Sequence, residues 1–173
     1  MEKEFFYVFC SGILGVRTNI EGFSWIYGSA APCSSLAAYE TCAIKFDIRL
    51  VPEKELEQST GENIQHFQAY VWNDRSHTLS CRRTLFGKIK LGYDLTIKEN
   101  TVSAQIGKNY YRFVKHRVMN LHGVYYLLSD LANILLLKNG YLSLYASAVY
   151  NRVTERCLVS FAPPNTGKTY TAV

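Results

Sequence analysis

The chain has 173 residues, of which 48% are hydrophobic and 19% are charged, and its formal net charge is +5. These totals fit a globular protein of one domain, or one and a half, and exclude a disordered or fibrous chain. No apolar run is long enough to span a membrane, and the acidic N-terminus is unlike a secretory signal. We therefore expect no membrane partner and a cytoplasmic location.

The five cysteines are scattered along the chain without Cys-x-x-Cys or Cys/His spacing. This pattern predicts free thiols in a reducing cytoplasm and no zinc site. Basic residues gather between Arg82 and Arg117, whereas residues 53–62 are mainly acidic. We interpret the basic stretch first as the solvated side of several strands, and second as a surface for a phosphorylated or acidic partner. No nucleic-acid-binding motif accompanies it, so nucleic acid is not an expected partner.

Residues 1–118 predict a β-rich module of short antiparallel strands. The clearest strand is 42–51, where apolar and polar residues alternate strictly and predict one buried face. Polar turns at 73–76 and 98–100 lie between apolar runs and predict two hairpins. Further strands are expected at 5–10, 13–18, 23–27, 67–72, 78–85, 88–91, 93–97, 101–106 and 109–114, with loops at 28–38 and 53–63.

The pattern changes near Met119. Apolar residues recur at helical spacing over 121–138, and Asn139-Gly140 is a favourable helix stop. Because this helix is apolar on more than one face, we expect it to be buried. Strands are predicted at 142–150 and 156–161, joined by a polar turn. The expected fold class is therefore α+β, or α/β: a β-rich module at 1–118, then one long helix and the first strands of a P-loop domain at 119–173.

A phosphate-binding loop motif follows the last predicted strand. A small residue, four spacers and Gly-Lys-Thr form a loop whose backbone N–H groups cradle a polyphosphate. Lys168 would reach the outer phosphates, and the Thr169 hydroxyl would bind Mg²⁺. The competing interpretation is a Pro-Pro-Asn turn followed by a surface lysine. The predicted ligands are ATP, or another nucleoside triphosphate, and Mg²⁺, and the predicted site residues are Ala162, Pro163, Pro164, Asn165, Thr166, Gly167, Lys168, Thr169 and Tyr170.

The order of these elements resembles the HPr kinase/phosphorylase family, and more closely the smaller HPr-kinase-like serine kinases of bacteria. The resemblance covers about 121–173 and rests on the long helix, on Leu-Tyr-Ala-Ser-Ala-Val at 144–149, and on Leu-Val-Ser-Phe at 158–161 directly before the loop. It implies a phosphoenolpyruvate-carboxykinase-like fold. It also implies Mg²⁺-dependent transfer of a phosphoryl group from ATP, or another high-energy phosphate, to a serine of a protein or peptide.

The sequence departs from the family pattern at two places. Tyr145 stands where such kinases often have a histidine, and Pro163-Pro164 replaces a Gly/Ser-rich start and removes two N–H donors. The acidic residues that activate the acceptor in the family lie beyond the loop, and the chain ends at Val173. We therefore expect a truncated and catalytically incomplete kinase, with its catalytic residues unknown.

Two other functions stay open at this point: a non-enzymatic binding or regulatory module, and a fragment of a different P-loop NTPase. An interrupted α/β sheet exposes an apolar edge, so self-association is a further possibility. Of the remaining polar side chains, we interpret His122 as a surface residue, Asp130 as part of a narrow polar stripe and Ser147 as a packing residue. The cluster at 74–77 is interpreted as turn chemistry rather than as a catalytic set.

Overall fold

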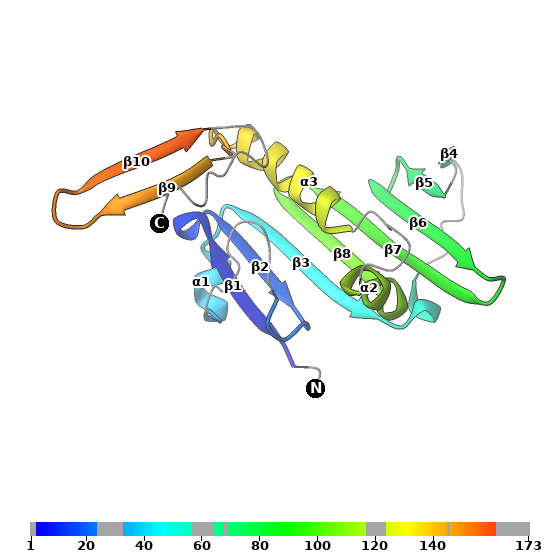
Figure 1. The fold of residues 1–173 in the computed structure, drawn as a ribbon. Coiled ribbons are helices and arrows are strands. Elements are labelled where there is room, and N and C mark those ends of the chain that lie inside the picture. The colour runs from blue at the N-terminus through cyan, green and yellow to red at the C-terminus, as the bar shows by residue number, and fades with distance from the viewer. Residues whose placement is uncertain are drawn as a thin grey trace. The chain divides into compact units, whose positions relative to one another are not determined.

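The structure is a computed structural model that describes residues 3–23, 33–56, 64–67, 69–116, 124–144 and 146–161. The chain divides into two compact units, 1–135 and 136–173. In the first unit, eight strands form one sheet in the order β1-β2-β3-β8-β7-β6-β5-β4 (Figure 1). These strands are β1 (Phe5–Phe9), β2 (Leu14–Thr18), β3 (Ile44–Val51), β4 (Ile64–Phe67), β5 (Tyr70–Asn73), β6 (Thr78–Leu85), β7 (Ile89–Lys98) and β8 (Thr101–Gly107).

The other described elements are short. The α-helices are α1 (Leu36–Glu40), α2 (Lys108–Lys115) and α3 (Val124–Lys138), and the 3-10 turns are η1 (Cys10–Gly12) and η2 (Glu53–Glu55). In the second unit, β9 (Ala146–Asn151) and β10 (Arg156–Phe161) form a separate antiparallel pair.

The predicted fold class is wrong. The main sheet is mixed, because β3 runs parallel to both β2 and β8, whereas the prediction was an antiparallel module followed by one long helix and the first strands of a P-loop domain. The turn residues of a hairpin predict an antiparallel pair. A parallel pair joins strands that are distant in the sequence, so it leaves no local signal. The predicted boundary near 118 lies outside the described residues.

Several local predictions are also corrected. The segment 109–114 belongs to α2, because a short apolar run does not distinguish a strand from a helix turn. A turn separates β4 from β5 inside the predicted strand 67–72. The predicted loop 28–38 includes the start of α1, where the Ser35 Oγ accepts the N–H of Ala38 at 3.2 Å as an N-cap. The predicted strand 23–27 lies almost wholly outside the described part of the chain.

The sheet of the first unit has one apolar face. Successive side chains alternate between the two faces of a strand, so one set of residues in β2, β3, β7 and β8 is buried together. On this face α2 packs through Tyr110, whose ring meets that of Tyr93 edge-on with centroids 5.1 Å apart. The buried set consists of Leu14, Val16, Ile44, Phe46, Ile48, Leu91, Tyr93, Leu95, Val102, Ala104 and Ile106.

The opposite face, here called the polar face, carries the alternating polar residues of β3, β7 and β8. At its β2 end it is covered by α1, since a Cβ on Gly15 would lie 2.9 Å from the Tyr39 ring. Beside α1, Asp47 pairs with Arg17 and with Arg49, and Arg49 also reaches Glu4 at 2.6 Å. The polar face comprises Lys45, Asp47, Arg49, Lys90, Asp94, Thr96, Lys98, Thr101, Ser103 and Gln105.

Candidate functional site

The predicted nucleotide-binding residues, Ala162 to Tyr170 with the Mg²⁺ ligand Thr169, lie outside the described residues. The structure does describe the element that leads to them. β10 ends at Phe161, so the motif follows a strand end directly (Figure 1). β10 pairs with β9 in the register Phe161 with Ala146 and Arg156 with Asn151, and residues 152–155 form the turn.

The turn of this hairpin is fixed by Asn151. Its Oδ1 accepts the N–H groups of Val153 at 2.9 Å and Thr154 at 3.1 Å. Glu155 then adopts a left-handed backbone with φ of 52°, which closes the turn onto β10. By the register, one face of the hairpin carries only apolar and sulfur-containing side chains: Ala146, Ala148, Tyr150, Cys157, Val159 and Phe161.

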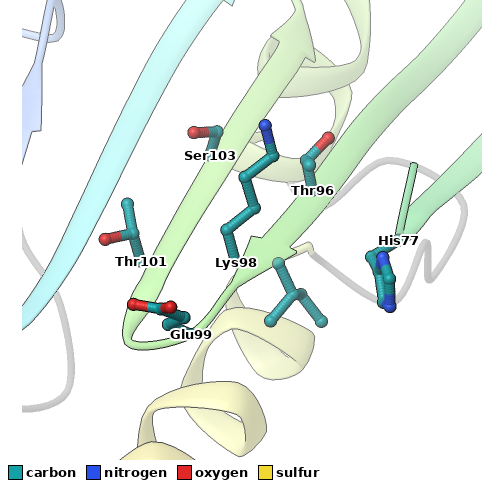
Figure 2. Close-up of a pocket in the computed structure, with 7 residues that line it drawn as sticks. His77, Thr96, Lys98, Glu99, Thr101 and Ser103 are labelled. Atoms are coloured by element: carbon teal, nitrogen blue, oxygen red, sulfur yellow. The ribbon is translucent and has the colours of Figure 1, made fainter. Parts of the chain in front are cut away.

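Two cavities in the first unit lie along β7. The first, the β7–β8 pocket, has a volume of about 860 Å³. Figure 2 shows the Lys98 side chain extending between Ser103 and Thr96. The Thr96 hydroxyl also pairs with that of Thr78 at 3.0 Å. This pocket therefore presents one ammonium group among hydroxyls, and its lining residues are His77, Thr96, Ile97, Lys98, Glu99, Thr101 and Ser103.

The second cavity, the η2 pocket, lies at the other end of β7 and has a volume of about 950 Å³. Lys90 is exposed at the start of β7, opposite Thr84 of β6. Lys54 and Glu55 of η2 are exposed as well. The lining residues are Glu53, Lys54, Glu55, Leu56, Val71, Arg82, Arg83, Thr84, Lys90 and Leu91.

An ion pair between β6 and β7 lies at the η2 pocket. The Arg82 Nη2 donates to both carboxylate oxygens of Asp94 at 2.7 Å, and its Nη1 donates to the carbonyl oxygens of Cys81 and Tyr93. Asp94 is buried, whereas the Arg82 side chain is 34% exposed, so the pair is partly shielded from solvent. These charge-assisted hydrogen bonds hold both side chains in place. The η2 pocket and the β7–β8 pocket lie at opposite ends of one strand, β7.

Glu53 connects the η2 pocket to α2. Its carboxylate accepts the backbone N–H of Asn109 and so caps a helix whose own N-cap residue, Gly107, has no side chain. The fit is close, because a Cβ on Gly107 would lie 2.8 Å from the Glu53 Oε1. Because glycine has no side chain, position 107 leaves room for the Glu53 carboxylate. The charge of Glu53 faces the positive end of α2.

Burial raises the pKa of two side chains in the main sheet, Cys81 of β6 and Tyr93 of β7. Burial raises the pKa of the Cys81 thiol, and the nearby Arg83 guanidinium opposes this shift. Burial likewise raises the pKa of the Tyr93 hydroxyl well above its usual range. Both side chains are buried in the core, and the raised pKa values favour their neutral forms at physiological pH.

Sequence reasoning missed both pockets. The basic stretch that begins at Arg82 indicates first a solvated surface and second a surface for a phosphorylated or acidic partner, without a pocket, and His77 indicates turn chemistry only. Lys90 and Lys98 are eight positions apart in a strand, and period-two alternation places them on one face. This spacing was the sequence signal that two lysines lie on the same face of one strand. No sequence signal predicted that η2 would line a pocket, because the position of η2 depends on the parallel pairing of β3 with β8.

No family model, curated protein or solved structure matches this chain. The described residues contain no group of three or more His, Cys, Asp or Glu side chains that is arranged to hold a metal ion. Within the same ranges, no helix is long and apolar enough to cross a membrane. Asp130 is exposed on α3, and His122 lies outside the described ranges.

Proposed function

We propose that this chain is an ATP-binding, catalytically incomplete protein serine kinase of the HPr-kinase-like type, with its nucleotide site at residues 162–169. One observation carries the proposal: a β-strand, β10, ends at the residue before the phosphate-loop motif. The expected context of such a motif is a buried strand in front of it and a helix after it. β10 supplies the strand in the expected element order, but five of its six residues are exposed, and the expected helix falls outside the described residues.

The proposed chemistry rests on few side chains of this chain. Lys168 neutralises charge on the outer phosphates, Thr169 binds Mg²⁺, and the N–H groups of 165–168 hold phosphate oxygens. Phosphoryl transfer depends mainly on such positioning and charge neutralisation. The acceptor is a serine of a protein or peptide, and the group that activates it is unassigned.

We place this activity in the cytoplasm, where ATP and Mg²⁺ are available. All five cysteines are free in the structure, and two of them, Cys33 and Cys157, are exposed. Exposed free thiols persist in a reducing compartment and are oxidised readily outside it.

Binding of a fluorescent ATP analogue to the full chain, with and without Mg²⁺, tests the nucleotide site. We expect saturable binding that Lys168→Ala weakens by at least about tenfold, since a charge-assisted phosphate contact is lost. Thr169→Ala should remove the Mg²⁺ dependence. The matched control is Lys88→Ala, which removes an exposed lysine in the β6–β7 turn and should leave the affinity unchanged.

A transfer assay with radiolabelled ATP and a library of serine peptides separates the kinase from its competitors. We expect ATP binding with little or no phosphoserine, and robust transfer that depends on Lys168 would overturn the proposed catalytic incompleteness. ATP hydrolysis without transfer favours a different P-loop NTPase. The nucleotide site itself is refuted if the chain does not bind ATP, or if Lys168→Ala binds ATP as tightly as the parent chain.

A further inference from the structure

We propose that the η2 pocket is an oxyanion site that binds the phosphate group of a phosphorylated ligand. Its described lining residues all belong to the first unit. The inference rests on these residues and not on the nucleotide loop. Its support comes from charge, from the rigidity of the pocket floor and from the types of side chain in the lining.

The charges in the lining favour an anion. Four basic residues, Lys54, Arg82, Arg83 and Lys90, line the pocket together with two carboxylates. Arg82 is paired with Asp94, and the Glu53 carboxylate is engaged by the N–H of Asn109. Among the described residues, neither the Lys54 nor the Lys90 ammonium makes an ion pair. With Arg82 balanced by Asp94, three basic residues face the two carboxylates of Glu53 and Glu55, so the described lining has an excess of one positive charge.

The floor of the pocket is rigid. The hydrogen bonds from Arg82 Nη2 to both oxygens of Asp94 hold one side, and Glu53 on the N-terminus of α2 holds the other. Gly92 packs tightly between them, since a Cβ there would lie 2.6 Å from the carbonyl oxygen of Cys81. Fixed walls reduce the entropy that is lost when a ligand is ordered. The two free lysines then supply the adaptable contacts.

The lining chemistry points to phosphate rather than to a nucleic-acid strand. Lysine ammonium groups act as point charges for phosphate, and the Thr84 hydroxyl adds a neutral donor. None of the described lining residues is aromatic, so these residues offer a base no ring on which to stack. A volume of about 950 Å³ accommodates a phosphoamino acid with its neighbours in a peptide. Because both lysines are exposed, we expect weak binding that falls with added salt.

Residue-resolved amide NMR on the full chain carrying Lys168→Ala tests the site without a contribution from the loop. The probes are inorganic phosphate, a phosphoserine peptide, the same peptide with unmodified serine, and chloride at matched ionic strength. We expect saturable shifts at 53–56 and 84–91 with the two phosphate probes only. Tighter binding of the phosphopeptide assigns the site to phosphorylated protein, and equal affinities assign it to free phosphate.

The control compares a double lysine variant in the η2 pocket with a single lysine variant in the β7–β8 pocket. Lys54→Gln combined with Lys90→Gln should weaken phosphate binding by at least about tenfold, while Lys98→Gln in the β7–β8 pocket should change it less than about twofold. Both replacements are exposed, and an unchanged spectrum elsewhere shows that the fold is kept. The proposal fails if chloride reproduces the shifts, if they do not saturate, or if the double variant binds phosphate as tightly as Lys98→Gln. Loss of ATP binding without loss of these shifts would refute only the nucleotide loop.

Discussion

The main sheet and the β9–β10 hairpin are both built from alternating strands joined by tight turns, yet they bury their side chains very differently. Phe46 in β3 is fully buried, whereas Leu158 and Phe161 in β10 are 72% and 62% exposed. The difference lies in the neighbours. β3 has a strand on each side, while β10 pairs only with β9 among the described strands. Strand pattern therefore predicts pairing, and further strands or helices decide burial.

The largest test of this contrast is a pair of truncations. Phe46→Ala removes a large side chain from the middle of the sheet and should lower the free energy of unfolding by about 3–5 kcal/mol. Leu158→Ala removes a mostly exposed side chain and should cost less than about 1 kcal/mol. Urea unfolding monitored by circular dichroism measures both. Equal costs would show that the hairpin is buried in solution and would remove the contrast.

A smaller effect is expected at two turns of identical design. Asn73 in the β5–β6 turn accepts the N–H groups of Arg75 and Ser76, as Asn151 does for two residues of the β9–β10 turn. Each turn also ends in a left-handed residue, His77 or Glu155. Replacement of either asparagine by alanine loses two exposed hydrogen bonds and should cost about 1 kcal/mol.

The two turn variants should differ in where the cost is found. Asn73→Ala should lower the global stability, because β5 and β6 belong to the large sheet. Asn151→Ala should instead speed hydrogen exchange within β9 and β10 and leave the global midpoint nearly unchanged. Hydrogen exchange read by mass spectrometry after proteolysis resolves the two regions. A global midpoint that falls equally in both variants would mean that the hairpin unfolds together with the sheet.

Local patterns in the sequence predicted much of this fold. The alternation at 42–51 corresponds to β3, with Ile44, Phe46 and Ile48 buried as expected. The turn at 98–100 joins β7 to β8 as predicted. The parallel pairing of β3 was not predictable, because no turn residue reports contacts between β3 and strands distant in sequence. The segment 109–114 became α2, which is capped by a carboxylate 56 positions earlier.

The two candidate sites differ in the same way, because one is a contiguous motif and the other is assembled from segments distant in the sequence. The phosphate loop is a contiguous motif, so the sequence alone predicts it, and it stays a prediction. The η2 pocket joins residues 53–56 to residues 82–91 and exists only because the sheet brings β3 and η2 near β6 and β7. Charge composition indicated a basic region there. The pairing of Arg82 with Asp94 and of Glu53 with Asn109, which decides which charges stay free, depends on tertiary contacts alone.

The finest test compares two cysteines. Cys81 belongs to β6 and is buried, whereas Cys157 belongs to β10 and is exposed. A thiol reagent should modify Cys157 at least about tenfold faster, because access and thiolate fraction both limit the reaction. Burial raises the pKa of Cys81, so its contribution to stability is complete below about pH 8.5, the pKa of an unfolded cysteine, and is lost as the pH rises further. Cys81→Ser should therefore flatten the fall of the melting temperature between pH 8 and 9.5, while Cys157→Ser should not. Equal reaction rates would mean that β6 opens as readily as the hairpin, which contradicts the contrast between the two regions.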